Sequence, residues 1–353
     1  MKSLLSITKV LSKYELLKSV FTLFISISII GCTKHSEVIY RVEQGYALGT
    51  TYNIKYEVKN DSINLKDAIE DIFKHVNKSM STYLPTSDIS RINKGDSTIV
   101  IDTLFKEVYI VSKDIWKKTD GTFDPTVGSL VNAWGFGPEN PLNDITQKQV
   151  DSILTFVGFD KVALTNDNRI VKNHPSIFLD FNAIAKGYTI DLIGRLFNEK
   201  GIENYLIELG GEILTKGKNS KLVKDWVVAI DHPLQTEEKR TLIAKVKLED
   251  KAMATSGNYR KFRIDKKTGA HYVHTIDTKT GYPKKSNVLS VSVIAPTCME
   301  ADAYATALMV MDLEKAKQLL KQLNGIDAYI IIADKDGDIE KYTTKGFQEL
   351  LID

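Results

Sequence analysis

The strongest candidates for chemistry in this sequence are an acid and a hydroxyl set into the apolar segment CMEADAYATALMVM, residues 298–311. Asp302 and Thr306 are four residues apart, and on a helix this spacing places both side chains on one face, one turn apart. Their two oxygens would suit a hard cation such as Mg²⁺, which proteins usually hold with one or two carboxylates, phosphate oxygens and water. The structural alternative has Asp302 favoured by the helix dipole and Thr306 bonded back to a carbonyl.

The start of this expected helix is marked by a capping pattern. Thr297 is followed three residues later by Glu300, which predicts a capping box and a helix beginning at about Cys298. The pattern accounts for Glu300 and leaves Asp302 without a capping role. Cys298 itself has no evident base beside it, so we expect a buried thiol.

A second candidate lies in LDFNAIAKGYTID, residues 179–191. Asp180 precedes a turn of small residues, and Lys186 enters an expected helix that runs from about Tyr188 to Phe197. A lysine at a helix N-terminus suits phosphate, through its charge and through the free backbone N–H groups. No Walker-type glycine pattern accompanies it, so a solvated lysine is the alternative.

The last two candidate site residues have ring side chains, His274 and Tyr83. His274, in HYVHTIDTKTGYP, lies on an expected half-buried strand, where an imidazole either accepts a proton near neutral pH or serves as a structural residue. Tyr83, in MSTYLPTSDISRIN, is expected on a loop, where it either stacks on a ligand ring or packs against the protein.

These residues need a scaffold of mixed strands and helices. The hydrophobic periodicity predicts helices over 65–81, 104–119, 188–197, 298–311 and 313–323, and strands over 46–58, 176–181, 205–211, 225–231, 241–248, 252–256, 288–296 and 328–333. Residues 121–138, rich in Gly and Pro, should form a structured loop that leads into a short helix. We expect a single catalytic domain of mixed α/β (α+β) type, with one or two lobes.

The N-terminus has the pattern of a bacterial lipoprotein signal. Four lysines lie within residues 1–18, residues 20–30 are largely apolar, and Gly31 stands directly before Cys32. The apolar run is short for a membrane span, which needs about 20 residues. We therefore expect a signal peptide over 1–31, a lipidated tether from Cys32 over 32–44, and the domain over 45–353. An uncleaved anchor with a chance cysteine is the alternative.

Charge and cysteine content exclude several classes. Removal of residues 1–31 would leave 322 residues and change the formal charge from +2 to −1. No basic excess then remains for nucleic acid. With Cys32 modified, only Cys298 is left, so no intrachain disulfide can form.

Eight segments, in their order along the chain, resemble the ApbE family of FAD:protein FMN transferases. They are LGTTYNI, MSTYLPTSDISRIN, GTFDPTVGSLVNAWGFGP, LDFNAIAKGYTID, IELGGEI, ATSGNYR, HTIDTKTGYP and VSVIAPTCMEADAYATALMVM. The resemblance covers the chain from about Gly45 to Met311. It implies an enzyme that transfers the FMN half of FAD to a threonine hydroxyl of an acceptor flavoprotein, releases AMP and requires Mg²⁺.

The family also implies partners and a location. Acceptors carry a D-x-x-[ST]-G-A-T type motif, and members are commonly lipoproteins on the periplasmic side of the bacterial inner membrane. FAD is then a substrate and Mg²⁺ the cofactor.

The family motifs assign roles to residues of this sequence. Asp302, Thr306 and the backbone carbonyl of Ala183 would bind the metal, and His274 is our hypothesis for the base that accepts the threonine proton. Leu48 replaces a methionine of many members, and Ala305 a second aspartate of some members. The expected FAD site comprises Leu48, Tyr83, Thr122, Phe123, Asp124, Asp180, Lys186 and Ile276.

Two other functions remain open on the sequence. An FAD pyrophosphatase would use the same site to pass FMN to water. An FAD-binding storage lipoprotein would need neither Asp302 nor Thr306 for catalysis.

Overall fold

A computed structural model describes residues 38–59, 63–142, 145–235, 240–257, 262–264, 271–273, 275–284, 287–336 and 338–352. The chain separates into two units, residues 1–39 and 40–353. We describe the second unit; of the expected site residues, Cys32 belongs to the first unit, and both Cys32 and His274 lie outside the described residues. No helix of the described residues is long and apolar enough to span a membrane.

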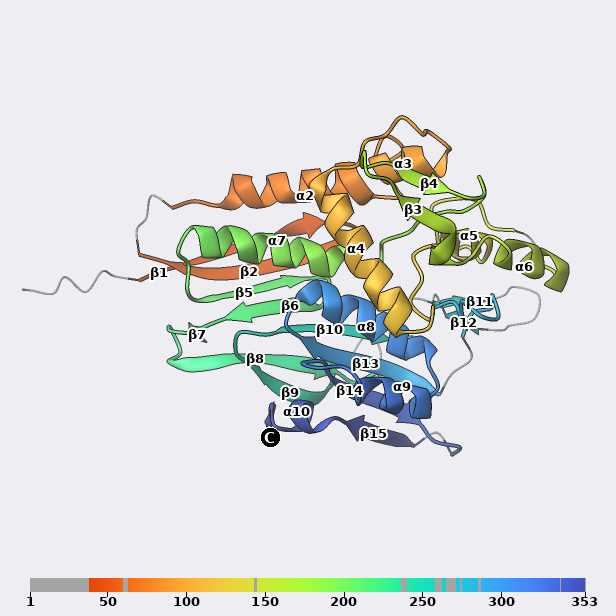
Figure 1. The fold of residues 1–353 in the computed structure, drawn as a ribbon. Coiled ribbons are helices and arrows are strands. Elements are labelled where there is room, and N and C mark those ends of the chain that lie inside the picture. Colours follow the sequence, from red (N-terminus) through yellow and green to blue (C-terminus); the bar gives the residue numbers. More distant parts are fainter. Residues whose placement is uncertain are drawn as a thin grey trace, which may run out of the picture. The chain divides into compact units, whose positions relative to one another are not determined.

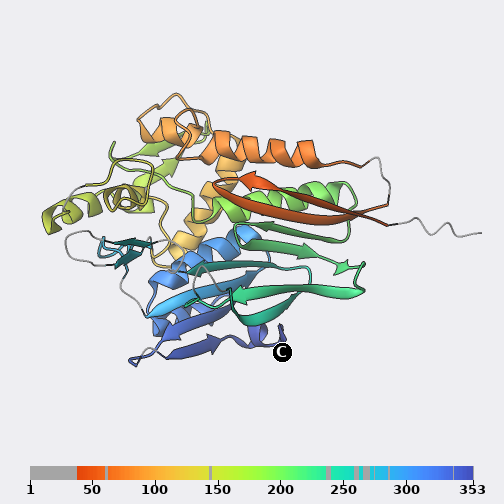
Figure 2. The ribbon, with the colours of Figure 1, turned by 180° about the vertical axis from the view of Figure 1, so that it is seen from behind.

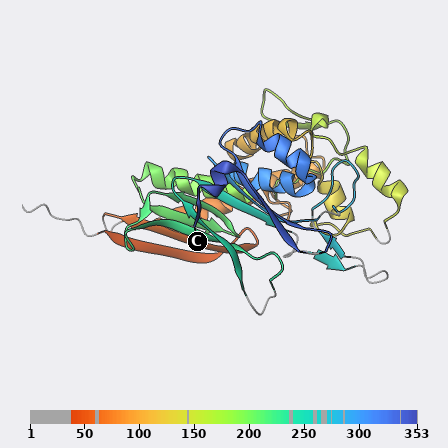
Figure 3. The same cartoon turned by 90° about the horizontal axis from the view of Figure 1, so that it is seen from below.

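A mostly antiparallel sheet of eight strands organises this unit, in the order β1-β2-β5-β6-β10-β13-β14-β15 (Figure 1). Its strands are β1 (Ile39–Ala47), β2 (Thr50–Val58), β5 (Tyr205–Leu209), β6 (Glu212–Lys216), β10 (Ala252–Gly257), β13 (Val288–Ala295), β14 (Asp327–Ala333) and β15 (Ile339–Thr343). Figures 1 and 3 show β1 and β2, in red, at one edge of the sheet.

Helices cover one face of the sheet, among them α2 (Lys66–Met80), α4 (Thr103–Lys118), α7 (Ala185–Glu199), α8 (Cys298–Val310) and α9 (Leu313–Leu320). Helix α3 (Asp88–Asn93) adds to the same core, and α5 (Gly128–Ala133) and α6 (Gln147–Leu154) form a smaller cluster. Helix α10 (Lys345–Gln348) packs on the other face through Phe347. Helix α8 packs on β10 and β13, and α7 packs on α8, β5 and β6. Figure 1 shows both helices in front of the sheet. Because α8 is buried on almost every side, its sequence is apolar throughout and Asp302 stands out.

A smaller sheet packs against the other face. It consists of β16 (Leu351–Ile352), β9 (Leu242–Leu248), β8 (Lys224–Asp231) and β7 (Lys218–Asn219), in that order. Ile213 and Met253 of the large sheet form a second core with Val228 and Val246 of the small one. Figure 2, seen from behind, shows β8 on this side. Three short pieces complete the description: η1 (Phe159–Lys161), the pair β3 (Val162–Leu164) and β4 (Ile170–Lys172), and the pair β11 (Phe262–Ile264) and β12 (His271–Val273).

The structure corrects the predicted strand over 46–58, which is a hairpin. β1 and β2 meet at Leu48-Gly49, and both residues have a positive φ, of 48° and 77°. Two consecutive positive-φ residues form the tight turn that suits the twist of paired strands. Because β1 begins at Ile39, the sheet also includes part of the segment expected as tether, and the domain begins before residue 45.

The predicted strand over 176–181 is also wrong. Ile177, Leu179 and Phe181 are buried as the alternation suggested, but only a single bridge links Phe178 to another segment. The side chain of Asn93 replaces a neighbouring strand, since it accepts a bond from the N–H of Leu179 and donates one to its carbonyl, at 2.8 and 2.9 Å. The other predicted helices and strands of the described residues are present with shifted ends.

Candidate functional site

The crossing of α7 and α8 brings two sequence motifs together. A side chain at Gly187 would lie 2.2 Å from the carbonyl oxygen of Cys298, so only glycine allows the helices to approach this closely. The N–H of Gly187 donates to Oδ2 of Asp302 over 3.2 Å. The glycine after Lys186 therefore places that lysine beside the acid of α8.

The start of α8 is fixed by a second acid. Asp191 of α7 accepts bonds from the N–H groups of Cys298 and Met299, at 2.8 and 2.9 Å. Burial raises the pKa of Asp191 to about 6, although these two bonds oppose the shift. Thr297 caps the helix as predicted, because it accepts from the N–H of Glu300, but the Glu300 carboxylate accepts from the hydroxyl of Thr297 and not from its backbone N–H as a full capping box requires. The buried thiol predicted at Cys298 is confirmed.

Lys186, Glu212 and Asp302 form a cluster, which we call the Lys186 cluster. Nζ of Lys186 lies 2.5 Å from Oε1 of Glu212 and 3.8 Å from Oδ2 of Asp302. The two acid side chains are almost fully buried, whereas that of Lys186 is 28% exposed. One cation thus bridges two buried acids from different elements, β6 and α8.

The charges of the Lys186 cluster depend on one another. Burial raises the pKa of Glu212 to about 7 although Lys186 opposes the shift, and burial also raises the pKa of Asp302. Burial lowers the pKa of Lys186, but Asp302 and Glu212 outweigh it and leave this pKa raised. With both acids ionised, the cluster has one uncompensated negative charge, which favours an additional cation.

The oxygen atoms of this region have capacity for such a cation. Oε2 of Glu212 is buried and has no hydrogen-bond partner among the described residues. The hydroxyl of Thr306 lies 3.5 Å from that of Ser256, at the limit of a hydrogen bond. Ala183, whose carbonyl was expected to bind metal, lies in the turn directly before α7.

These donors fit Mg²⁺. Within the described residues, no group of three or more His, Cys, Asp or Glu side chains could hold a metal. Mg²⁺ does not require one, because it commonly uses one or two carboxylates and completes its shell with phosphate and water. A buried carboxylate, a hydroxyl and a carbonyl are therefore a suitable set.

Most of the expected FAD residues lie on loops and turns, whereas Lys186 is on α7. Tyr83 lies in the turn after α2, which confirms the predicted loop position, and it is 61% exposed; its stacking on a ligand stays a prediction. Burial of its phenol raises the pKa of Tyr83, and the negative charge of Asp180 adds to the rise, so these two residues are neighbours. Burial likewise raises the pKa of Asp180.

The loop of Thr122, Phe123 and Asp124 is rigid. Phe123 is in the core, and the buried carboxylate of Asp124 accepts bonds from the indole of Trp116, from the N–H and hydroxyl of Thr126 and from the N–H of Phe159. Thr122 is half-buried. The N–H of Asp180 donates to the carbonyl of Pro125, which joins this loop to the start of the α7 motif.

The two remaining FAD residues are apolar. Leu48 is at the hairpin turn and packs partly on the main core, and Ile276 is buried and forms a bridge with Pro283. The role predicted for His274 stays a prediction, since that residue lies outside the described ones.

Sequence reasoning missed Glu212 and Asp191. Glu212 follows a glycine pair at the start of a strand, and nothing in that local pattern indicates burial or its pairing with Lys186, 26 residues away. Asp191 lies on a helix that was correctly predicted, but its partners are 107 and 108 residues away.

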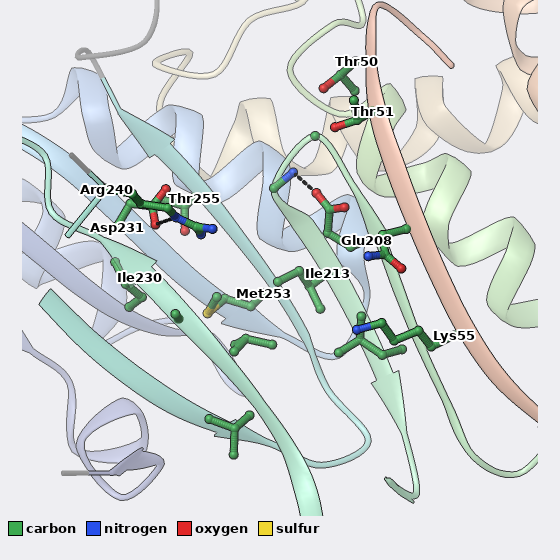
Figure 4. A pocket seen from close by; sticks show the side chains of 17 residues that line it. Thr50, Thr51, Lys55, Glu208, Ile213, Ile230, Asp231, Arg240, Met253 and Thr255 are labelled. Atoms are coloured by element: carbon green, nitrogen blue, oxygen red, sulfur yellow. Dashed lines mark hydrogen bonds and ion pairs between the residues drawn. The ribbon is translucent and has the colours of Figure 1, made fainter. Parts of the chain in front are cut away.

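A cavity of about 580 Å³ lies on the opposite face of the sheet (Figure 4). Ile213 and Met253 line it, together with polar side chains that include Lys55, Glu208 and Arg240. Since side chains alternate along a strand, Glu212 points to the helices while its neighbour Ile213 points into this cavity. The cavity is therefore separate from the Lys186 cluster.

Comparison with known proteins shows the family. The model of the ApbE family matches residues 48–330. The FAD:protein FMN transferase of Haemophilus influenzae is 35% identical over 95% of this chain and 98% of its own, and that of Vibrio cholerae is 35% identical over 91% and 95%. The solved structure of the flavin transferase ApbE from Vibrio cholerae has a TM-score of 0.78 and 33% identity, and covers 89% of this chain and 99% of that one.

These findings confirm the resemblance read from the sequence, the mixed α/β fold class and the assignment to the transferases among enzymes. With the match spanning most of the chain, from the β1–β2 turn to β14, the chain belongs to the ApbE family.

Proposed function

We propose that this protein is an FAD:protein FMN transferase. It moves FMN from FAD to a threonine hydroxyl of an acceptor flavoprotein, forms a phosphoester bond and releases AMP, with Mg²⁺ as cofactor. The observation that carries the proposal is the Lys186 cluster, in which two buried acids and a lysine meet at the N-terminus of α7, one helical turn before Thr306. The names of the Haemophilus and Vibrio relatives support it.

Phosphoryl transfer requires mainly positioning and charge neutralisation. Asp302, Thr306 and the carbonyl of Ala183 would hold Mg²⁺, which supplies neutralisation of the pyrophosphate charge. Lys186 adds a permanent cation, because the two acids keep it protonated. Its backbone neighbours add less, because the N–H groups of Ala185 and Gly187 already donate to Phe181 and Asp302.

Glu212 leaves Asp302 available for a metal ion, because it binds Lys186 itself. Lys186 is 2.5 Å from Glu212 and 3.8 Å from Asp302, so Glu212 is its closer partner. Without Glu212, the lysine would neutralise Asp302 directly and compete with a metal ion. We assign Glu212 to positioning Lys186.

The reaction exchanges a phosphoanhydride bond of FAD for a phosphoester bond to threonine. The threonine oxygen forms a bond to the FMN phosphorus, the bond from that phosphorus to the AMP oxygen breaks, and AMP leaves with the electron pair. The threonine proton needs an acceptor. We propose His274 for this step, from its sequence motif and the near-neutral pKa typical of imidazole.

The acceptor and the location follow from the sequence. We propose an acceptor with a D-x-x-[ST]-G-A-T type motif and a lipid anchor on Cys32 that holds the protein on the periplasmic side of the inner membrane.

One experiment tests the activity. The mature chain is incubated with FAD, Mg²⁺ and an acceptor domain that contains the motif, and intact-mass spectrometry follows the acceptor while chromatography follows AMP and FMN. The proposal expects one FMN per acceptor, with AMP released in equal amount, and no transfer by Asp302→Ala. AMP and free FMN with an unmodified acceptor would indicate a pyrophosphatase, and tight FAD binding without AMP would indicate a storage protein.

A further inference from the structure

The turn between β7 and β8 exposes two large apolar side chains in succession. Leu222 is 62% exposed and Val223 is 88% exposed, the latter more than any other large apolar residue of the described chain. Val223 also has a φ of 52°, in the left-handed region that a β-branched residue rarely adopts. A glycine at this position would relieve the strain and the exposure together.

The turn is held firmly in this conformation. Glu57, itself buried, accepts bonds from the N–H and the hydroxyl of Ser220, at 3.0 and 2.6 Å. The N–H groups of Leu222 and Val223 donate to the carbonyls of Asn219 and Ser220. Nothing within the turn requires an apolar side chain at its tip, so the two residues are directed at something outside the protein.

Lysines surround the exposed tip. Lys221 and Lys224 are exposed directly beside it, and Lys218 precedes it on β7. Asp225 is the nearest acid along the chain, and it already pairs with Lys218 at 3.5 Å and with Lys247 at 2.8 Å. An apolar tip with basic flanks is the arrangement by which proteins contact anionic lipid surfaces.

Few residues separate the expected lipid anchor from the strand beside the tip. The ammonium of Lys221 is 5.6 Å from the ring centre of Tyr40, and Figures 1 and 2 show the β7 turn and this part of β1 at the same end of the sheet. Tyr40 is only eight residues after Cys32. Even a fully extended chain of that length spans no more than about 28 Å, so a lipid on Cys32 would keep the tip near the bilayer.

We propose that the turn of residues 220–224 is a membrane contact, in which Leu222 and Val223 enter the lipid headgroup region while Lys221 and Lys224 face anionic phosphates. The contact orients the tethered enzyme on the membrane. It is independent of the transfer chemistry, and it rests on the lipid anchor proposed at Cys32.

The test uses the full lipidated chain with Val223→Cys, labelled with the environment-sensitive fluorophore NBD. Cys298 is buried and Cys32 carries the lipid, so the label is selective. The protein is reconstituted into vesicles of phosphatidylcholine with one-third phosphatidylglycerol. Val171→Cys is the matched control, because Val171 is a 52% exposed valine on β4, far along the chain from the turn.

The proposal expects NBD at position 223 to shift to the blue in vesicles, to be quenched by spin-labelled lipid and to lose accessibility to iodide several-fold. NBD at position 171 should stay accessible, and vesicles of phosphatidylcholine alone should weaken the effect at 223. Equal iodide quenching at both positions would overturn the proposal, and so would mass spectrometry that finds no lipid on Cys32.

A second variant, Val223→Gly, distinguishes loss of the membrane contact from loss of folding. Val223→Gly suits the backbone conformation and should unfold at the same or a higher temperature than the wild type, yet an NBD label on Leu222→Cys should be more accessible to iodide in this background. FMN transfer to a soluble acceptor, measured on the same proteins, should be unchanged. Loss of that transfer in every sample would count against the proposed activity and not against the membrane contact.

Discussion

Two buried acids beside α8 have opposite surroundings. Asp191 uses its carboxylate to accept the N–H groups of Cys298 and Met299, and so completes the first turn of the helix. Asp302, one turn further along, accepts one backbone N–H, from Gly187, and faces the ammonium of Lys186. A carboxylate whose oxygens already accept backbone N–H groups stabilises the fold. A carboxylate that faces a lysine side chain can exchange that partner for a ligand.

Two other acids repeat this difference. Asp124, which the family resemblance places in the FAD site, accepts four hydrogen bonds from neighbouring protein groups, so this comparison predicts a structural role for its carboxylate like that of Asp191. Glu212 belongs with Asp302, since one oxygen binds Lys186 and the other is buried without a partner among the described residues. The comparison therefore predicts from hydrogen-bond partners alone which buried acids are structural and which belong to the proposed site.

The largest effect is expected for Asp302→Asn, which tests the functional class directly. Changes in groups that only support metal ligands typically cost 10- to 100-fold, so loss of the ligand charge should lower FMN transfer by at least about 100-fold. The melting temperature should change little, because the variant removes a buried charge. Intact-mass spectrometry of the acceptor and thermal unfolding check both parts, and near-normal transfer would remove Asp302 from the site.

Asp191→Ala tests the structural class. Two backbone N–H groups would lose their partner, and at about 1–3 kcal/mol for each unsatisfied buried donor we expect a loss of about 2–6 kcal/mol in the free energy of unfolding. Urea denaturation measures the loss. If stability is unchanged while transfer disappears, Asp191 belongs to the functional acids and the comparison fails.

Glu212→Gln tests whether Glu212 keeps Lys186 from neutralising Asp302. Lys186 should then turn to Asp302, and we expect the affinity for Mn²⁺ in the absence of FAD to fall by about 10-fold. The double variant Lys186→Met with Glu212→Gln removes the competing cation and should recover most of that affinity. Mn²⁺ titration followed by electron paramagnetic resonance distinguishes this outcome from a general loss of structure, in which the double variant would be weaker still.

The smallest effect is a pH dependence of stability. The pKa of Glu212 rises from its ordinary value of 4.5 to about 7 in the folded protein, because the carboxylate is buried. Well below pH 4.5 the group is protonated in both states, so the metal-free protein should lose stability as the pH rises from about 4.5 to about 7.

The matched comparison for this dependence is Glu212→Gln, which has no group to titrate there. The difference in unfolding free energy between wild type and variant should change across this pH range and stay constant above it. A difference that is flat with pH would mean that Glu212 is ionised without cost.

Local patterns in the sequence were sufficient for part of this molecule. The face shared by Asp302 and Thr306 could be predicted because both lie on one helix with a clear cap at Thr297. The hairpin at Leu48 could not, since a leucine rarely marks a left-handed turn. The role of Glu212 depends on α7 crossing α8, which Gly187 permits and no local periodicity reveals.

The proposed lipid anchor and membrane contact would make strand β1 determine the distance between the membrane and the expected FAD site. One end of the strand follows the tether at Tyr40 and the other leads into the turn at Leu48, where the family resemblance expects FAD. At about 3.3–3.4 Å per residue, the eight steps between these residues span about 27 Å. With the residue 220–224 turn on the lipid surface, FMN would be transferred at a fixed distance from the membrane. Acceptors whose threonine reaches that distance would be modified, whereas acceptors whose threonine lies at the bilayer surface would not.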